Sequence, residues 1–198
     1  MSEMRTASFT RKTTETEISV ELNIDGEGTY KIDTGIGFLN HMLELFTRHG
    51  LFDLKVTCKG DLEVDAHHSV EDIAIAIGEC FKQGAGDKAG INRYGHALIP
   101  MDEALIRCAL DLSGRPFLVA ELGNMKREEV GGLPTEMVDH FWRSFSTHFP
   151  MNLHIDVLRG EDTHHIIEGV FKAVTKALRG ALDYDPRRKG VPSTKGVL

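Results

Sequence analysis

A five-residue pattern, two adjacent histidines followed three residues later by a glutamate, occurs twice in this chain. It reads HHSVE at residues 67–71 and HHIIE at residues 164–168. With this composition, one copy is expected by chance roughly once per 5,000 positions. Imidazole and carboxylate groups together suit several first-row divalent metals. Two copies in one chain therefore indicate a metal centre built from both.

The spacing within each copy predicts how the side chains point. Residues three and four apart share one face of a helix, so each glutamate lies beside its own histidines. Adjacent residues on a helix point about 100° apart. His67 and His68 therefore cannot readily bind one ion together, and neither can His164 and His165. Each copy offers ligands in two directions, which favours two metal ions.

Two further histidines complete a ligand count for two metals. His41 is followed eight residues later by His49, and His140 is followed eight residues later by His148. With His41 and His140 included, the set provides three imidazoles and one carboxylate for each metal and leaves positions open for substrate and water. The competing interpretation for either one alone is a buried core histidine. Cysteine takes no part, which argues against a closed structural zinc site.

Other residues near the motifs have structural interpretations. A single copy of the motif could be the start of a helix with an acidic residue near the helix dipole. Asp72 directly follows Glu71, and we interpret it as a residue that supports the ligands or caps the helix. The remaining histidines that we interpret as structural are His49, His96, His148 and His154.

The elements that must position these ligands follow from the hydrophobic pattern. Apolar residues that alternate with polar ones predict strands at residues 17–25, 52–58, 105–112, 116–122 and 151–158. Helical spacing predicts helices at residues 38–50, 68–84, 137–148 and 163–182. Residues 25–28 are expected to form a hairpin turn into residues 29–32. The turn at residues 113–115 joins two of the strands.

The order of these elements repeats, which is typical of a duplicated structural unit. We expect an α+β fold of two similar βαβ-type halves from internal duplication, with helices packed on one face of mixed β-sheets. Without a linker between the halves, residues 1–198 are expected to form one compact catalytic domain. Its pseudo-repeats cover about residues 6–92 and 93–184, followed by a basic C-terminal tail at residues 185–198.

Composition narrows the class of protein further. The formal net charge of −7 argues against general affinity for nucleic acid. The apolar runs are too short to span a bilayer, and the N-terminus lacks the apolar core of a signal peptide. Cys58, Cys80 and Cys108 are interpreted as buried residues in a reducing compartment. We therefore expect a cytoplasmic enzyme, although a transit peptide could have been removed.

Several motifs together resemble the imidazoleglycerol-phosphate dehydratase family. They are GFLNHML (residues 37–43), HHSVEDIA (67–74), GINRYG (90–95), DLSGRP (111–116), HHIIEG (164–169) and PSTKG (192–196). The resemblance runs from about residue 6 to the C-terminus and keeps the order and spacing of the family. The phosphatase domain that is fused to the enzyme in some bacteria is absent, so the chain looks like the monofunctional form.

The resemblance implies an activity, a cofactor and an assembly. Family members remove water from imidazoleglycerol phosphate to give imidazoleacetol phosphate in histidine biosynthesis. The implied site holds two Mn²⁺ ions, which bind the substrate's imidazole as imidazolate. The implied assembly is a homo-oligomer of 24 subunits built from trimers, with active sites at subunit contacts. The metal ligands carried over are His41, His67, His68, Glu71, His140, His164, His165 and Glu168.

The resemblance also implies substrate contacts. The residues that match the phosphate-binding positions of the family are Arg93, Arg115, Ser193 and Lys195. Glu15 matches a residue that reaches the substrate of a neighbouring subunit. Lys172 lies one helical turn beyond Glu168 and is a further candidate for a substrate contact. The proton must be removed by a base, for which Glu168 and Glu71 are favoured and Glu15 is the alternative.

Two other functions compete with this interpretation. A dinuclear metallohydrolase would also place two metals together, but such sites usually contain more aspartates than these motifs offer. A metal-storage or structural protein could use the histidine clusters only to hold an assembly together. That function leaves the four expected phosphate-binding residues without a role.

Overall fold

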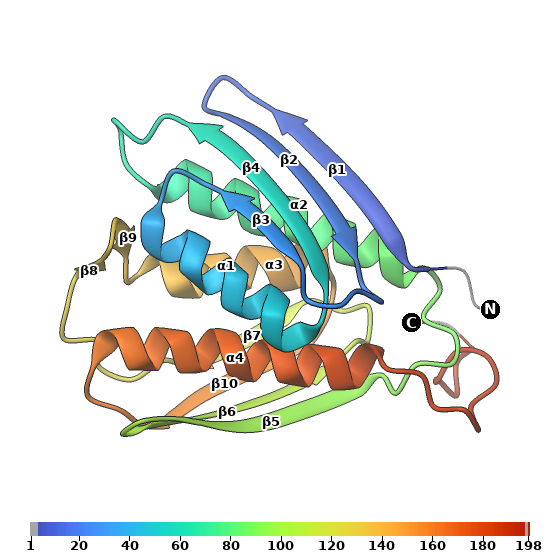
Figure 1. Cartoon of the computed structure of the whole chain (residues 1–198). Coiled ribbons are helices and arrows are strands. Elements are labelled where there is room, and N and C mark those ends of the chain that lie inside the picture. The colour runs from blue at the N-terminus through green and yellow to red at the C-terminus, as the bar shows by residue number, and fades with distance from the viewer. Residues whose placement is uncertain (1–3, 197) are drawn as a thin grey trace.

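The strands and helices form three layers, in which four helices lie between two four-stranded sheets (Figure 1). The computed structural model describes residues 4–196 and 198. Residues 1–3 and 197, which the predicted domain and its tail include, lie outside the described residues.

The elements of the two halves follow the same order. The first half contains β1 (Thr6–Lys12), β2 (Thr16–Asn23), β3 (Tyr30–Asp33), α1 (Gly37–Gly50), β4 (Asp53–Gly60) and α2 (His67–Ala85). The second half contains β5 (Tyr94–Met101), β6 (Ala104–Asp111), β7 (Phe117–Glu121), α3 (Met137–His148), β10 (Asn152–Arg159) and α4 (Thr163–Leu182). A short hairpin of β8 (Glu129–Val130) and β9 (Leu133–Pro134) precedes α3.

Strand order shows that the two halves are copies of one unit. The first sheet has the order β1-β2-β4-β3, and the second has the corresponding order β5-β6-β10-β7. In each sheet one strand pair is parallel, β3 with β4 and β7 with β10. The predicted α+β class with mixed sheets and an internal duplication is confirmed.

The predicted hairpin from residues 25–28 into residues 29–32 is wrong. Strand β3 pairs with β4, which separates it from β2. The carboxylate of Asp53, at the start of β4, explains the crossing. It accepts the backbone N–H groups of Glu27 and Thr29 at 2.9 Å and the Thr29 hydroxyl at 2.7 Å. These bonds hold the loop across the end of β4, so the chain continues on its far side.

Each sheet is covered by helices on one face only. Along β2 the buried residues alternate with exposed ones, as in Ile18, Val20 and Leu22 against Glu17 and Ser19. Successive side chains of a strand point to opposite faces, so this alternation directs one face to the helices. The prediction that helices pack on one face of each sheet follows from this pattern and is confirmed.

The helix layer joins the two halves. Helix α2 packs on β1 and β2 and also contacts α3, while α4 packs on β5 and β6 and also contacts α1. The first helix of each half therefore lies beside the motif helix of the other half. This arrangement decides which histidines meet.

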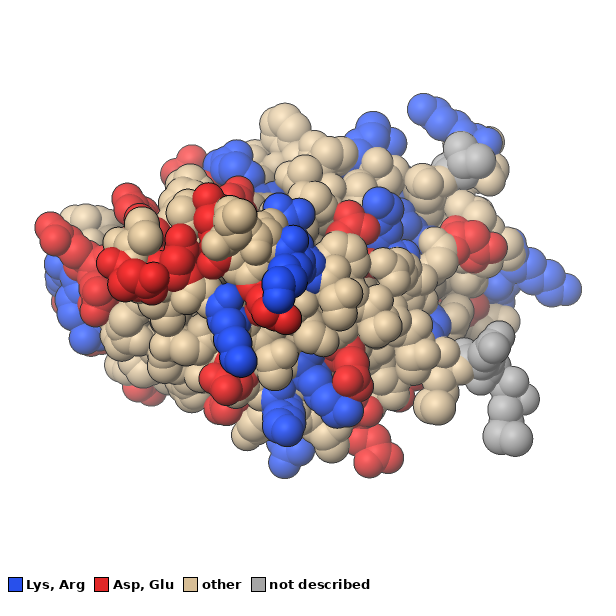
Figure 2. Space-filling view, turned by 90° about the horizontal axis from the view of Figure 1, so that it is seen from above, with Lys and Arg blue, Asp and Glu red and all other residues tan. Residues whose placement is uncertain are grey.

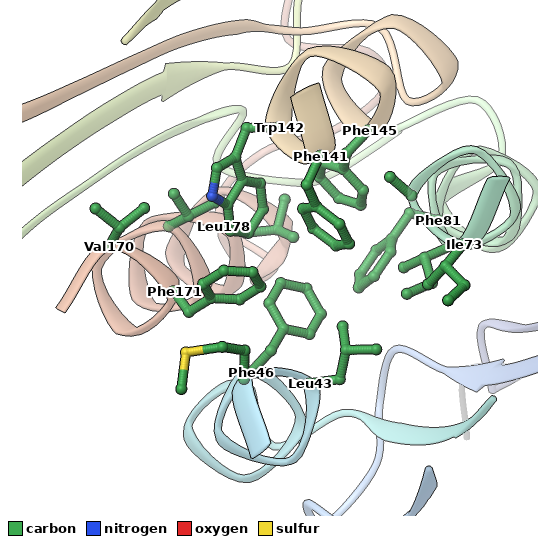
Figure 3. Packing of buried hydrophobic residues seen from close by; sticks show 14 of the residues in the cluster. Leu43, Phe46, Ile73, Phe81, Phe141, Trp142, Phe145, Val170, Phe171 and Leu178 are labelled. Carbon is green, nitrogen blue, oxygen red and sulfur yellow. The ribbon is translucent and has the colours of Figure 1, made fainter. Parts of the chain in front are cut away.

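Aromatic side chains from all four helices hold this layer together (Figure 3). The ring of Phe46 on α1 meets those of Phe81 on α2 and Trp142 on α3, with centroids 5.8 and 6.3 Å apart. Trp142 meets Phe171 on α4 at 4.8 Å. Such pairs contribute about 0.5–1.5 kcal/mol each beyond the burial of their area. The helix starts that carry the motifs are thus held on a packed core.

The remaining composition-based expectations concern cysteines and membranes. All three cysteines are free and buried, as predicted. Within residues 4–196 and 198, none of the helices combines the length and the apolar character needed to cross a bilayer.

Candidate active site

An aspartate two residues before each motif fixes the start of its helix. The Asp65 carboxylate accepts the N–H of His67 at 2.8 Å. The Asp162 carboxylate accepts the N–H groups of His164 and His165 at 2.7 and 3.3 Å. These bonds satisfy N–H groups that the first turn of a helix leaves without a helical partner. All four helices begin at the same end of the molecule (left in Figure 1), so both motifs lie there.

His41, His164 and Glu168 form the tightest group of candidate ligands. The Nε2 atoms of His41 and His164 lie 3.4 and 3.2 Å from one oxygen of Glu168, Oε2. One ligand atom from each of the three residues lies within 4.8 Å of the others. His41 belongs to the first half and the motif to the second, and they meet because α1 packs against α4.

Glu168 lies beneath the two histidines and is the most enclosed member of this group. Its side chain is 8% exposed, against 44% for His41 and 38% for His164. The Lys172 ammonium lies 2.5 Å from its other oxygen, Oε1. Burial opposes ionisation of this carboxyl, but the hydrogen bond and charge of Lys172 outweigh burial and lower the pKa of Glu168. Glu168 is therefore a carboxylate with both oxygens already engaged.

The matching group in the other motif is more open. The rings of His67 and His140 lie 5.1 Å apart, centroid to centroid, and Glu71 Oε1 lies 3.5 Å from the Ser144 hydroxyl. Among the residues that the structure describes, only the first group brings three candidate ligand atoms within 4.8 Å. The position that matches Lys172 in α2 is occupied by Ile75. The two glutamates therefore have different surroundings despite the duplication.

The outer histidine of each pair points away from its own group and toward a carboxylate. His68 Nδ1 lies 3.1 and 3.2 Å from the two oxygens of Asp61, and His165 Nδ1 lies 2.8 Å from Glu103 Oε2. These hydrogen bonds raise the pKa of each histidine. An ionised carboxylate can only accept, so Nδ1 carries the proton and the neutral ring has its lone pair on Nε2. The predicted divergence of each histidine pair is present.

Glu15 lies at the tip of the β1–β2 hairpin, beside the first motif. Its Oε1 atom is 3.8 Å from His68 Nε2, and its side chain is half exposed. The hydrogen bond from the Asp61 N–H to the Glu15 carbonyl, 3.1 Å long, connects this tip to the loop before α2. The structure thus places Glu15 next to an outer histidine rather than next to Glu71 or Glu168.

The expected phosphate-binding residues lie at the opposite end of the molecule. The Arg93 guanidinium donates to both oxygens of Asp111, at 2.7 and 3.0 Å, and to the Pro192 carbonyl at 2.8 Å. These bonds use three of its five N–H donors and leave two for an anion. Through the Pro192 carbonyl, Arg93 fixes the tail immediately before Ser193. Lys88, which is buried, donates to the Leu112 carbonyl at 3.2 Å and supports the same turn.

The Arg115 turn and the end of the tail also meet. Gly114 has a φ of +73°, and a Cβ placed on it would lie 2.6 Å from the Leu198 carbonyl carbon. Arg115 and Lys195 are both exposed. In Figure 2, acidic side chains gather toward the motif end of the face that is shown, and lysine and arginine side chains lie farther along that face with acidic side chains among them. The acidic side chains at the motif end favour a divalent cation there.

Within one chain, the two groups of residues are too far apart to bind one small substrate. Glu168 lies near the start of α4. The backbone N–H of Arg93 donates to the Ala181 carbonyl, near the end of the same helix, at 2.9 Å. A helix rises about 20 Å between residues 168 and 181. The ring and phosphate of the expected substrate are joined by a chain that spans about 6 Å when extended.

Several carboxylates of this site were not predicted from the sequence. They are Asp61, Asp65, Glu103 and Asp162. An aspartate two residues before both motifs is the one signal that could have been noticed, since it recurs with the repeat. Asp61 and Glu103 occupy different places in the two halves, so no pattern distinguishes them. Of the histidines interpreted as structural, His148 bonds Glu79 at 3.0 Å.

Comparisons with known proteins show the family to which the chain belongs. Residues 34–178 match the family model described as imidazoleglycerol-phosphate dehydratase. The imidazoleglycerol-phosphate dehydratase of Caldanaerobacter subterraneus is 56% identical over 195 residues, which cover 98% of this chain and all of that protein. The enzyme of the same name from Clostridium acetobutylicum is 53% identical over 198 residues and covers both chains completely.

Solved structures of the same name share the fold. The crystal structure of imidazoleglycerol-phosphate dehydratase from Staphylococcus aureus superposes with a TM-score of 0.79 at 40% identity, covering 90% of this chain and all of that one. The Pyrococcus furiosus protein, solved in complex with (S)-C348, has a TM-score of 0.82 at 33% identity, covering 96% and 100%. The chain therefore belongs to the imidazoleglycerol-phosphate dehydratase family, the hydro-lyases of histidine biosynthesis.

Proposed function

We propose that this protein dehydrates imidazoleglycerol phosphate to imidazoleacetol phosphate at a site that holds two Mn²⁺ ions. The observation that carries the proposal is the separation of ligands within one chain. His41, His164 and Glu168 converge, the rings of His67 and His140 lie 5.1 Å apart, and the two outer histidines bond other carboxylates.

The donor atoms of these groups fit divalent metals. Each inner group offers two imidazoles and one carboxylate, a mixture that suits first-row ions including manganese. The oxygen of Glu168 that both histidines approach is where a cation would neutralise the buried carboxylate. When bound, the two ions would supply Lewis acidity that favours the anionic form of the substrate's imidazole.

The glutamates are assigned two roles, metal binding and proton transfer. The hydroxyl on the carbon next to the ring leaves as water, and the proton on the following carbon must pass to a base. Glu168 is engaged by Lys172 and by two histidines, which favours a ligand role for it. Glu71 and Glu15 have fewer contacts, and either can carry this proton. The enol that results then becomes the ketone.

Assembly would complete the site. Each inner group lacks one of the three imidazoles counted for each metal. The Nε2 atoms of the outer histidines have loose partners, Glu15 at 3.8 Å from His68 and Asp102 at 3.5 Å from His165. The phosphate-binding residues lie about 20 Å from Glu168 along α4. A neighbouring subunit can supply both. We propose a cytoplasmic homo-oligomer of 24 subunits built from trimers, with active sites at subunit contacts.

Arg115→Ala is expected to raise the KM for imidazoleglycerol phosphate about 10- to 100-fold with a smaller change in kcat. Hydrogen bonds to charged groups contribute about 1.5–3 kcal/mol, which corresponds to this range. Steady-state kinetics measure both constants. Arg107→Ala is the matched control, because Arg107 is an exposed arginine that pairs with Asp156 at 3.1 Å on the outer face of the second sheet. An unchanged KM for Arg115→Ala would remove this residue from the phosphate site.

Product analysis distinguishes the proposed dehydratase from a metallohydrolase. The Mn²⁺-loaded protein is incubated with imidazoleglycerol phosphate and, separately, with a panel of phosphoesters. The proposal predicts a ketone product that retains its phosphate, and no cleavage of the panel. Release of inorganic phosphate without ketone formation would establish a hydrolase instead.

A further inference from the structure

The carboxylate of Asp72 fastens the hairpin that carries Glu15 to the first motif helix. We propose that Asp72 is a positioning residue, which holds Glu15 at the height and angle from which it reaches a neighbouring subunit's substrate. This inference rests on the proposed role of Glu15. Asp72 follows Glu71 directly in the sequence, but it bonds residues of the distant strands β1 and β2. The inference gives it a role in the reaction through these bonds.

Asp72 bonds residues on both strands of the hairpin. Its Oδ2 atom accepts the Thr16 hydroxyl at 2.6 Å, and its Oδ1 atom pairs with Arg11 Nε at 3.0 Å. Arg11 is on β1 and Thr16 begins β2, so the two contacts lie on either side of the tip. Asp72 and Thr16 are 6% and 3% exposed. These two bonds hold the hairpin firmly, because breaking either one would leave a buried carboxylate charge without a hydrogen-bond partner.

The tip itself is held at the backbone, while its carboxylate makes a loose ion-pair contact with His68. The Thr13 hydroxyl oxygen accepts the N–H groups of Glu15 and Thr16 at 3.1 and 3.0 Å. The Glu15 carbonyl accepts the Asp61 N–H. The Glu15 carboxylate is half exposed and only 3.8 Å from His68. The side chain is therefore available for a partner outside this chain, and its origin is fixed by Asp72.

The corresponding hairpin of the second half is held in a different way. At the tip of the β5–β6 hairpin, Glu103 accepts the N–H groups of Glu161 and Asp162 at 3.1 and 2.8 Å and also bonds His165. These bonds tie the Glu103 carboxylate to the start of α4 within the same chain.

Gly169 occupies the position that matches Asp72. A Cβ there would lie 2.3 Å from Ile106 Cδ1, so a side chain at this place would require the Ile106 side chain to move. The duplication has thus given one hairpin a half-exposed carboxylate on an anchored tip and the other a carboxylate bonded to the start of the second motif helix.

Asp72→Asn tests the proposal in the Mn²⁺-loaded, assembled protein. Asparagine keeps the shape and can still accept from Thr16, but it loses the charge that pairs with Arg11. We expect kcat to fall about 10- to 100-fold, as for supporting residues around a catalytic group. KM should stay within about threefold, and the Mn²⁺ content and oligomer size should equal those of the wild type. Arg11→Gln removes the same ion pair but keeps Asp72, and the same fall in kcat is expected for it. This variant provides the test if Asp72→Asn does not fold.

Glu17→Gln is the matched control on the same hairpin. It removes the ion pair between Lys12 and Glu17, whose side chains are 72% and 60% exposed. Exposed pairs of this kind contribute little, so kcat should stay within about twofold. A loss in this variant equal to that of Asp72→Asn would mean that any change to the hairpin is harmful, which would overturn a specific role for Asp72.

Coupling to Glu15 separates positioning from general support of the helix. On a Glu15→Gln background, Asp72→Asn should lower the residual kcat by less than twofold, because the group that it positions is already gone. A full additional loss, or a loss of Mn²⁺ in Asp72→Asn, would overturn the inference and place its effect on the metal ligands. Wild-type protein without turnover would instead refute the proposed function, and an active Glu15→Gln would refute the role of Glu15.

Discussion

Glu168→Gln is expected to lower kcat by more than 100-fold while leaving the fold intact. Its carboxylate is the point on which His41 and His164 converge, and its other oxygen holds Lys172. The amide removes the negative charge that a metal needs and leaves the Lys172 ammonium, 19% exposed, without its partner. Losses of 10–100-fold are typical for residues one step removed from a metal, so a direct ligand should exceed them.

The measurements are kcat, bound Mn²⁺ per subunit and circular dichroism. Glu161→Gln is the matched control, because Glu161 lies just before the same helix, is 81% exposed and pairs only loosely with Lys126 at 3.5 Å. The control should keep its kcat within about twofold. A Glu168→Gln protein with near-normal kcat would exclude this residue as an essential ligand and as the base.

Two inactive variants are expected to restore activity when they are assembled together. One is Glu168→Gln, which damages the metal end of its own chain. The other is the double variant Arg115→Ala/Lys195→Ala, assayed far below its raised KM, which damages the phosphate end. If each site takes its metal end from one subunit and its phosphate end from another, random mixing leaves about a quarter of the sites with both ends intact.

Co-expression with two different affinity tags isolates the mixed oligomers. Activity near a quarter of the wild-type value supports sites at subunit contacts. Activity no higher than the average of the two parents would contradict them, since each chain would then have to supply both ends by itself. The separation along α4 makes the first result the expected one.

The fold could be predicted because its hydrophobic pattern occurs twice along the chain. Period-two and helical patterns recur in both halves, and identical strand orders follow from the same sequence plan. Strands β1 and β5 were missed. They lie at the sheet edges, where exposed and partly buried residues blur the alternation. The hairpin at residues 25–32 was wrongly predicted because the side chain that redirects it, Asp53, belongs to a later strand.

The site could be predicted only as a set of ligands. Helical geometry explains why His67 and His68 diverge, but not that His41 meets the motif of the other half. That meeting depends on packing between α1 and α4, which no local pattern encodes. Glu103 was missed for the same reason, because it bonds His165, which is 62 positions away. Asp72 was named from the sequence, but its bond to Thr16, 56 positions away, was not predicted.

The most direct test of the proposed function is metal-dependent conversion of imidazoleglycerol phosphate by the wild-type protein. The protein is stripped with a chelator, assayed for imidazoleacetol phosphate, and assayed again after Mn²⁺ is returned to two ions per site. We expect no product from the stripped protein and full recovery on addition of Mn²⁺, with oligomer size followed in parallel. Undiminished product formation by metal-free protein, or no product under any metal condition, would contradict a dinuclear manganese dehydratase.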